Sequence, residues 1–297
     1  MFEAPDNDLP TATIIAMPVK TASKPAVPAI NAAENLCEVI SNEWVNAEYK
    51  HLILKAPAIA LTVLPGQFFH LMCPPSGADQ PYLRRPMSLY RVDREAAVIE
   101  FLYKVQGAGT RGLATLVTGG VLDAFGPVGE GFVIAPGTRH ILVLARGVGL
   151  ATMAPLAEFA GQRGAKVTAI LSARSKPLVM STDYLRSVGA DVHVVDDEDG
   201  SSDAADVERL IRHVHADTPF DLLTTCGSNR LLQLVQRLGN ELKVPGQVAL
   251  EQHMGCALGM CFACVKPFRN SPGCAETSYR RVCWDGPVFD VQETVAW

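Results

Sequence analysis

EQHMGCALGMCFACVKPFRN, residues 251–270, is the stretch with the most distinctive pattern in this chain, and RRVCWDGPVF follows it at residues 280–289. Three cysteines of the first stretch are spaced as C-x4-C-x2-C, and a fourth lies in the second stretch: Cys256, Cys261, Cys264 and Cys283. This is the spacing of plant-type iron–sulfur proteins, in which four thiolates hold a [2Fe–2S] cluster. The sequence therefore predicts a [2Fe–2S] centre with these four cysteines as ligands.

Small residues between the cysteines fit this chemistry, namely Gly255, Ala257, Gly259 and Ala263. Little side-chain bulk lets the loop fold tightly, so that backbone N–H groups can point at the sulfurs and help to set the reduction potential. The alternative is a structural zinc site, which usually has two short C-x2-C pairs. One such pair, a C-x4-C arm and a distant fourth cysteine favour the iron–sulfur interpretation.

The composition bounds the class of protein. A chain of 297 residues can form two compact domains and a small third one. Hydrophobic residues make up 48% and charged residues 19%, as in soluble globular proteins. The net charge of −5 without a basic patch argues against a nucleic-acid partner, and no apolar run is long enough for a membrane span. Since four of the eight cysteines belong to one ligand pattern, we expect a cytoplasmic protein without disulfides.

The first 35 residues are rich in Ala, Pro, Thr and Asn and sustain no periodicity. We expect residues 1–35 to form a poorly ordered arm, in which Thr13 to Val19 could pair as an edge strand. The same arm could instead serve an interface.

From Leu36 the sequence changes to six short β-like runs separated by Pro, Gly or Asp, at 36–45, 49–57, 66–73, 85–92, 97–105 and 119–128. Six short strands at this spacing predict a closed antiparallel barrel, because closure removes exposed strand edges. We assign this barrel to residues 36–137.

The second half of the chain alternates between strand-like and helical runs. The strand-like runs are 140–147, 166–175, 191–201, 221–228 and 247–252, and the helical runs are 148–161, 203–215 and 229–242. Such alternation implies a parallel, Rossmann-like sheet with helical crossovers. We assign a nucleotide-binding domain to residues 138–248 and a small cluster domain to residues 249–297.

The order of barrel and nucleotide sheet resembles the ferredoxin–NADP reductase superfamily. Arg85-Pro86-Met87-Ser88 stands where that superfamily has R-P-x-S or R-x-Y-S, and Gly109-Thr110 resembles its G-T segment at a helix start. The resemblance implies an FAD whose pyrophosphate meets the Arg85 guanidinium and the helix start. Taken singly, an Arg-Arg pair is more often a solvated face and Gly-Ala-Gly a plain loop. The implied FAD residues are Arg85, Pro86, Met87, Ser88, Tyr103, Lys104, Gly109 and Thr110.

A nucleotide turn follows the first strand of the second half. Gly147 and Gly149 give G-x-G between a strand and a helix, which permits close approach of a pyrophosphate. The superfamily often has G-G-G-V-G here, whereas this chain has Ala145-Arg146 before Gly147; the arginine could bind the pyrophosphate or narrow the site. Cys226-Gly227 resembles a turn that lies near nicotinamide and flavin in the superfamily, although a buried thiol is the alternative. Arg174 follows the second strand, where a 2′-phosphate could bind, so the choice between NAD and NADP stays open.

The stretch MGCALGMCFACV together with RRVCWDGPVF resembles the cluster domain of the electron-transfer subunits of class 1B dihydroorotate dehydrogenases. The resemblance implies an electron relay from NAD(H) through FAD to the [2Fe–2S] cluster, with an FMN-containing catalytic subunit as partner in a hetero-oligomer such as a heterotetramer. Another flavoenzyme or a ferredoxin-type acceptor could take the partner's place. A zinc-stapled, nucleotide-binding regulatory protein is the alternative of a different class.

Two cysteines compete for the fourth ligand position. Cys283 matches the family's V-C-x-D-G-P, in which Asp285-Gly286 makes a tight turn. Cys274 follows Pro272-Gly273 in a segment expected to be a loop tip, which is a poor place to hold a ligand rigidly. We therefore expect Cys283 to be the ligand.

Overall fold

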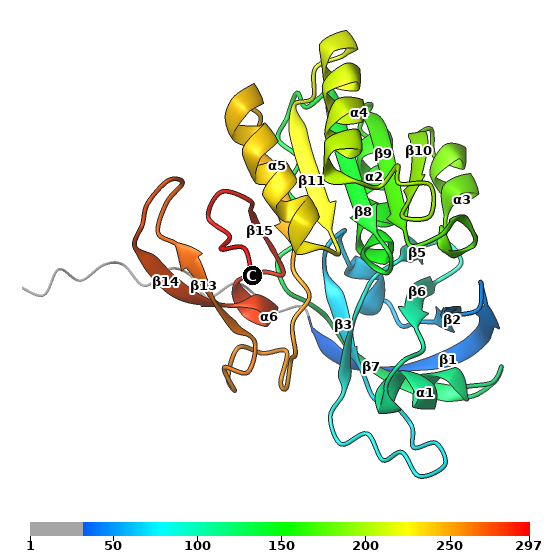
Figure 1. Ribbon diagram of the computed structural model, residues 1–297. Helices are drawn as coiled ribbons and strands as arrows, with labels where there is room; N and C mark the ends of the chain where they lie inside the picture. Colours follow the sequence, from blue (N-terminus) through cyan, green and yellow to red (C-terminus); the bar gives the residue numbers. More distant parts are fainter. Residues whose placement is uncertain (1–31) are drawn as a thin grey trace, which may run out of the picture. The chain divides into compact units, whose positions relative to one another are not determined.

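The computed structural model describes residues 32–297 as a curled antiparallel sheet, a second and mostly parallel sheet covered by helices, and a small C-terminal hairpin (Figure 1). The predicted strand at Thr13 to Val19 and most of the predicted arm lie outside the described residues. The first strand begins at Ala33, so residues 33–35 of that arm are β-structure. Within the described range, no helix is both long and apolar enough to cross a bilayer.

The antiparallel sheet has the strand order β4-β3-β7-β1-β2-β6-β5. Its strands are β1 (Ala33–Trp44), β2 (Tyr49–Lys55), β3 (Phe68–Leu71), β4 (Arg85–Ser88), β5 (Arg91–Asp93), β6 (Val98–Lys104) and β7 (Val121–Val128). Buried and exposed residues alternate along β1, as expected for a strand with one face on a core. The short helices η1 (Ala60–Thr62) and α1 (Ala108–Ala114) lie in its connections.

The predicted count of six strands is wrong by one, because the run at 85–92 divides between two sheet edges. The amide of Leu89 donates to the Gln67 carbonyl beside β3, at 3.2 Å, whereas the amide of Tyr90 donates to the Glu100 carbonyl on β6, at 2.9 Å. The two edge strands β4 and β5 are thus joined by two residues. The sheet is therefore a curled half-barrel whose edges meet through the chain itself rather than by a closed ladder.

The second sheet has the order β10-β9-β8-β11-β12-β15, with the first five strands parallel and β15 antiparallel to β12. Its strands are β8 (His140–Arg146), β9 (Lys166–Ala173), β10 (Asp191–Asp196), β11 (Leu222–Cys226), β12 (Gly246–Ala249) and β15 (Val288–Asp290). The helices are α2 (Gly149–Gly161), η2 (Lys176–Leu178), α3 (Thr182–Ser187), α4 (Ala204–Asp217) and α5 (Asn229–Leu242). The parallel strands agree with the predicted alternation, while β15 and α3 were not foreseen.

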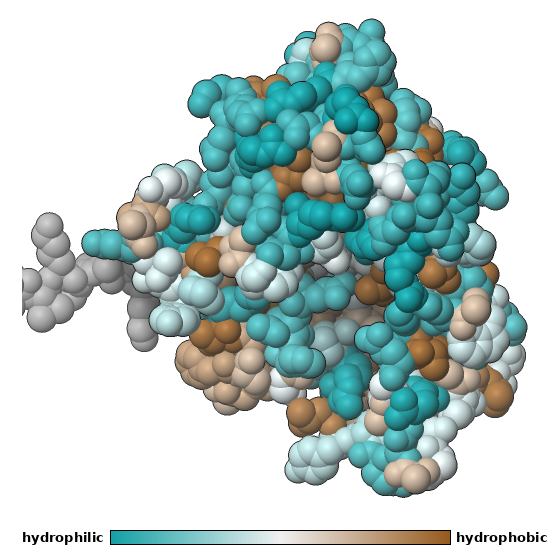
Figure 2. Space-filling view, viewed as in Figure 1, coloured by the Kyte–Doolittle hydropathy of each residue, from teal (hydrophilic) through white to brown (hydrophobic). Residues whose placement is uncertain are grey.

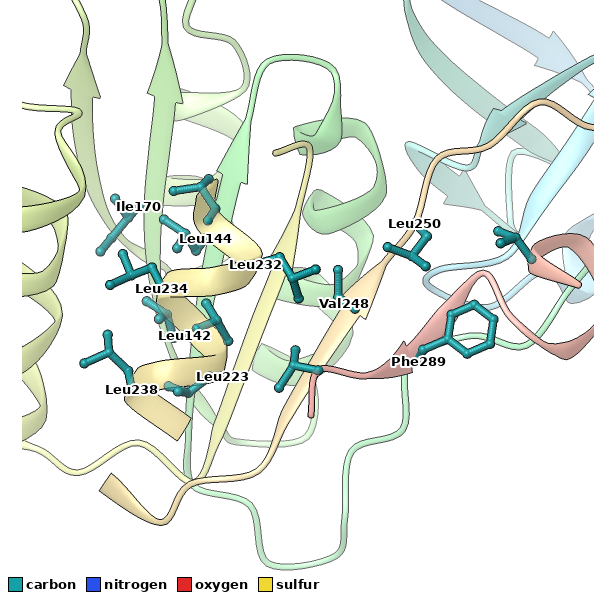
Figure 3. Packing of buried hydrophobic residues seen from close by; sticks show 14 of the residues in the cluster. Leu142, Leu144, Ile170, Leu223, Leu232, Leu234, Leu238, Val248, Leu250 and Phe289 are labelled. Atoms are coloured by element: carbon teal, nitrogen blue, oxygen red, sulfur yellow. The ribbon is translucent and has the colours of Figure 1, made fainter. Parts of the chain in front are cut away.

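Successive residues of β8 point to opposite faces of this sheet. Leu142 and Leu144 pack in one core cluster with the apolar side of α5, which Figure 3 shows close up. Ile141 and Val143 pack in the other cluster with α2. Burial on both faces explains why the strands read as continuous apolar runs in the sequence.

The C-terminal hairpin consists of β13 (Val265–Arg269) and β14 (Thr277–Arg281) and is followed by the single turn α6 (Val282–Asp285). The chain leaves the second sheet after Ala249 and returns to it at Val288, which is the residue paired with Ala249. At this junction the amide of Leu250 donates to the Pro287 carbonyl at 2.9 Å. Both ends of the cysteine-bearing segment are therefore fixed at neighbouring points of one sheet edge.

Candidate functional site

A cavity of about 380 Å³ lies between the curled sheet and the carboxyl ends of the parallel strands. Its wall includes seven residues with predicted cofactor roles: Pro86, Met87, Ser88, Tyr103, Lys104, Thr110 and Cys226. They come from β4, β6, α1 and β11, which are far apart in the sequence. The cavity lies where the order of the parallel strands reverses, between β8 and β11, which is where ligands bind in sheets of this kind.

Arg85 and Gly109 lie immediately outside this wall and in contact with each other. A Cβ on Gly109 would come within 2.7 Å of Cγ of Arg85, so only glycine allows this approach without a shift. The Thr110 hydroxyl accepts hydrogen bonds from the amides of Gln106 and Gly107, each at 3.0 Å, and so caps α1. The arrangement places a guanidinium beside the start of a helix.

Arg84, the neighbour of Arg85, has a different environment. Its guanidinium binds both carboxylate oxygens of Asp123 on β7, at 2.9 and 2.5 Å. This bidentate pair ties the β3–β4 connection to β7, whereas the Arg85 guanidinium donates to the carbonyls of Leu83 and Arg84. The two arginines are therefore not one solvated pair.

The nucleotide turn and the turn after β11 pack backbone against backbone. A Cβ on Gly149 would lie 2.6 Å from the Cys226 carbonyl oxygen, and one on Gly227 would lie 2.3 Å from that of Arg146. Gly227 also has φ of +107°, a conformation that other residues rarely adopt. Gly147, Gly149 and Gly227 shape this end of the cavity without lining it, while their neighbours Val148 and Cys226 do line it.

The Cys226 thiol is completely buried at the end of β11. Burial raises its pKa, the nearby Glu251 carboxyl raises it further, and a hydrogen bond with Thr152 opposes them. The thiol is therefore held protonated at neutral pH.

Arg146 replaces a glycine of the superfamily pattern, and its guanidinium is bound by side chains of two neighbouring segments. It donates to the Ser172 hydroxyl at 2.7 Å and to both carboxylate oxygens of Asp197, at 3.1 and 2.6 Å. The hydrogen bond from Arg146, with another from Ser202, lowers the pKa of Asp197 to about 2. Arg146 thus clamps β8, β9 and the end of β10 together.

Glu251 lines the cavity but received no cofactor role from the sequence. Glu251 is exposed to solvent within this wall. Thr152, Leu250 and Met254 line the same wall. The sequence could have indicated Glu251 by its position, because it closely follows β12 and the carboxyl ends of parallel strands are where ligands bind in such sheets.

The loop at 255–264 wraps around the Cys256 sulfur. Ala257, Gly259 and Phe262 have φ between +57° and +70°, which turns successive amides inward. The amides of Leu258, Met260 and Cys261 point at this sulfur from 3.4, 3.3 and 3.5 Å. Burial raises the pKa of Cys256, but the amides and the Cys261 thiol together lower it to about 7.

Cys256 and Cys261, whose thiols are in hydrogen-bond contact, form one pair. Cys264 and Cys283 form a second pair, in which the Cys283 amide points at the Cys264 sulfur from 3.4 Å. Burial, together with the Cys264 thiol, raises the pKa of Cys283 to about 12. Within residues 32–297 no three His, Cys, Asp or Glu side chains converge on a point where one metal ion could bind. Two thiol pairs with amides aimed at the sulfurs suit a cluster of two irons, each of which takes two thiolates.

Cys274 lies outside both pairs, in the tip between β13 and β14, where its amide donates to the Ser271 carbonyl at 3.1 Å. The predicted ligands Cys256, Cys261, Cys264 and Cys283 instead share one loop and the start of α6. Asp285 accepts the Arg281 amide at 2.7 Å and so closes the turn that holds Cys283.

The sulfur site reaches the protein surface beside apolar side chains. Cys261 is exposed, and its neighbours Met260 and Phe262 are 76% and 63% exposed. Figure 2 shows apolar residues gathered at the lower left, over the loop that connects β12 to β13 in Figure 1.

A curled sheet, a parallel nucleotide sheet and a four-cysteine segment together define an electron-transfer protein with the fold of ferredoxin–NADP reductases. A solved NADH-dependent reduced ferredoxin–NADP oxidoreductase shares this fold with a TM-score of 0.73 at 24% identity, over 88% of this chain and 90% of that one. The ferredoxin reductase of a carbazole 1,9a-dioxygenase gives a TM-score of 0.55 at 19% identity, over 74% and 67% of the two chains.

Sequence comparison identifies the family. Residues 251–295 match the iron–sulfur cluster binding domain of dihydroorotate dehydrogenase B. The NAD(+) electron transfer subunit of that enzyme from Geobacillus kaustophilus is 36% identical over 234 residues, 78% of this chain and 86% of the relative. The Bacillus cereus (strain Q1) subunit is 32% identical over 259 residues, 86% and 96% of the two chains. The chain belongs to the family of dihydroorotate dehydrogenase B electron transfer subunits, and it is an oxidoreductase component.

Proposed function

We propose that this chain binds one FAD and one [2Fe–2S] cluster and passes electrons between NAD(H) and a partner flavoenzyme. The observation that carries the proposal is the shared cavity. Its wall runs from the Arg-Pro-Met-Ser strand and α1, past the turn after β11, to Met254, two residues before the first cluster cysteine. One space therefore adjoins all three predicted binding regions.

FAD fits the residues of the curled sheet. Arg85 beside the start of α1 offers a guanidinium and helix N–H groups to a pyrophosphate, with Gly109 and Thr110 shaping the approach. Pro86, Met87 and Ser88 with Tyr103 and Lys104 offer two strands for the flavin ring to lie against.

The nicotinamide coenzyme is assigned to the opposite wall. Gly147 and Gly149 admit its pyrophosphate, and Cys226-Gly227 borders the nicotinamide. The relatives are named as NAD(+) subunits, which supports NAD(H) as the coenzyme. When bound, the flavin takes two electrons together from a nicotinamide, and the cluster carries them singly. The contribution of the chain is to hold these groups close together and to exclude water around them.

The cluster is assigned to Cys256, Cys261, Cys264 and Cys283. We further propose that the partner is the FMN-containing catalytic subunit that interconverts dihydroorotate and orotate, within a cytoplasmic hetero-oligomer that serves pyrimidine biosynthesis. The names of the relatives support this partner. The exposed apolar side chains of Met260 and Phe262 beside Cys261 offer it a docking surface.

Anaerobic purification with flavin and metal assays tests the cofactors, and about one FAD and two irons per chain are expected. Stoichiometric zinc without flavin would refute the proposal. Stopped-flow absorbance then tests the relay: NADH is expected to bleach the flavin, and dihydroorotate to do so only with the partner present. Direct bleaching by dihydroorotate would refute the assignment as a relay subunit.

A further inference from the structure

One carboxylate joins the curled sheet to the nucleotide sheet beside the cavity. Glu48, which directly precedes β2, forms an ion pair with Lys104 Nζ at 2.8 Å and another with the Arg174 guanidinium. Lys104 ends β6 and lines the cavity, whereas Arg174 follows β9 directly. A single acidic side chain therefore holds one cation from each of the two sheets.

The position of Glu48 is fixed by the backbone around it. Asn46 Oδ1 accepts the amides of Glu48 and Tyr49, at 2.9 and 3.1 Å, and the Val105 amide donates to the Glu48 carbonyl at 2.9 Å. The Tyr49 hydroxyl lies 3.4 Å from the point where a Cβ on Gly147 would stand. The backbone that carries Glu48 is thus held in place independently of Arg174.

The end of β9 is where dinucleotide-binding sheets distinguish their coenzymes. An acidic residue there accepts the ribose 2′-hydroxyl of NAD, whereas an arginine accommodates the 2′-phosphate of NADP. This chain has two cations in the segment, Arg174 and Lys176, which could accommodate a phosphate. Both are already paired, Arg174 with Glu48 and Lys176 with Asp199 at 3.2 Å.

Resting on the coenzyme role proposed above, we propose that Glu48 sets the preference for NAD(H) by withholding Arg174 from the 2′-phosphate. A phosphate monoester carries nearly two negative charges at neutral pH. It would have to displace Glu48 from Arg174 and then lie beside that carboxylate. NAD(H) meets neither cost, because its 2′-hydroxyl can donate to a carboxylate. The specificity determinant would thus come from the flavin-binding sheet and not from the nucleotide sheet.

The test compares flavin reduction by NADH and NADPH in the holoprotein, with kcat/KM as the readout. Glu48→Gln keeps the side-chain shape and removes the charge. It should raise kcat/KM for NADPH about ten-fold, the worth of one charge-assisted hydrogen bond, and change that for NADH by less than about three-fold. The double variant with Arg174→Ala should lose this gain, and Arg174→Ala alone should leave the ratio near its original value.

The matched control is Glu208→Gln, which also removes a carboxylate bound by two cations, Arg212 and Arg237, on the outer helices. It should leave the NADPH to NADH ratio unchanged. If NADH reduces the flavin but Glu48→Gln leaves the ratio unchanged, or keeps its gain without Arg174, this inference is wrong and the proposed function stands. If neither coenzyme reduces the flavin of the unaltered protein, the proposed function itself fails.

Discussion

The amide of Cys283 points at the sulfur of Cys264 across 3.4 Å, so two cysteines 19 positions apart form one side of the sulfur site. Cys274, although closer to Cys264 in the sequence, lies at the tip of the β13–β14 hairpin. We expect Cys283→Ser to abolish or shift the EPR signal of the reduced cluster, because a serine oxygen is a harder donor than a thiolate. Flavin content should be largely kept.

Cys274→Ser is the matched control, and it should leave the EPR signal unchanged. Loss of the signal in Cys274→Ser together with its survival in Cys283→Ser would reverse the ligand assignment.

Arg85→Ala should weaken FAD binding. A guanidinium paired with a phosphate contributes about 1.5–3 kcal/mol, so the Kd for FAD should rise roughly ten- to a hundred-fold. Equilibrium dialysis of the flavin measures this, with iron content as a check on the cluster domain. Arg139→Ala serves as the control, because Arg139 directly precedes the start of β8 and its side chain is 86% exposed. Equal FAD affinity in both variants would remove Arg85 from the flavin site.

Gly149→Ala should impair reduction by NADH without loss of either cofactor. The added Cβ would lie 2.6 Å from the Cys226 carbonyl oxygen and push apart the two turns beside the cavity. A shift of about 1 Å in the position of a bound reactant slows its reaction by about a hundred-fold. Stopped-flow absorbance would detect such a decrease in the rate of flavin reduction. Gly164→Ala adds a methyl group into open space and should cost only about 1 kcal/mol of stability for its positive φ. NADH reduction at the original rate in Gly149→Ala would contradict the assigned turn.

His70 should make the protein less stable as the pH falls from about 6.5 to about 4. Burial on β3, with the Arg84 charge, lowers the pKa of this imidazole to about 4. Within that window the unfolded chain binds a proton that the folded chain does not, so the free energy of unfolding decreases as the pH falls.

Thermal denaturation followed by circular dichroism at several pH values measures this effect. The decrease in Tm across the window should be smaller in His70→Gln than in the original protein. Some slope should remain, because burial also lowers the pKa of His140. An unchanged slope in His70→Gln would show that this imidazole is not the cause.

The sequence predicted the strand runs and their two kinds of sheet because local patterns encode them. The residues at Asn229–Leu242 match the predicted helix at both ends, since Ser228 accepts the Leu231 amide at its start and Lys243 leaves the helical region at its end. The division of the run at 85–92 into two strands was not predictable. It depends on the distant residues to which the amides of Leu89 and Tyr90 donate their hydrogen bonds. The strand β15 is three residues long and carries too little pattern to be recognised.

In the candidate site, too, features set by short stretches of sequence were predictable, and features set by distant strands were not. The cysteine spacing and the glycine turns lie within short stretches, so their roles could be proposed from residue order. Glu48 and Glu251 were overlooked as cofactor-site residues, because their surroundings come from strands far away in the sequence. Arg146 and Arg174 were noticed, but their acidic partners Asp197 and Glu48 depend on the fold.

The hydrogen bond between Leu250 and Pro287 has a consequence for how such a protein can be assembled from parts. Without the residues between them, β12 and β15 would be the two arms of an ordinary hairpin. The cluster-bearing segment is therefore a cassette, added at a point where the chain already turns back. Insertions whose two ends lie close together disturb their host little. A flavin reductase could gain or lose such a cassette without altering the strand order of its nucleotide sheet.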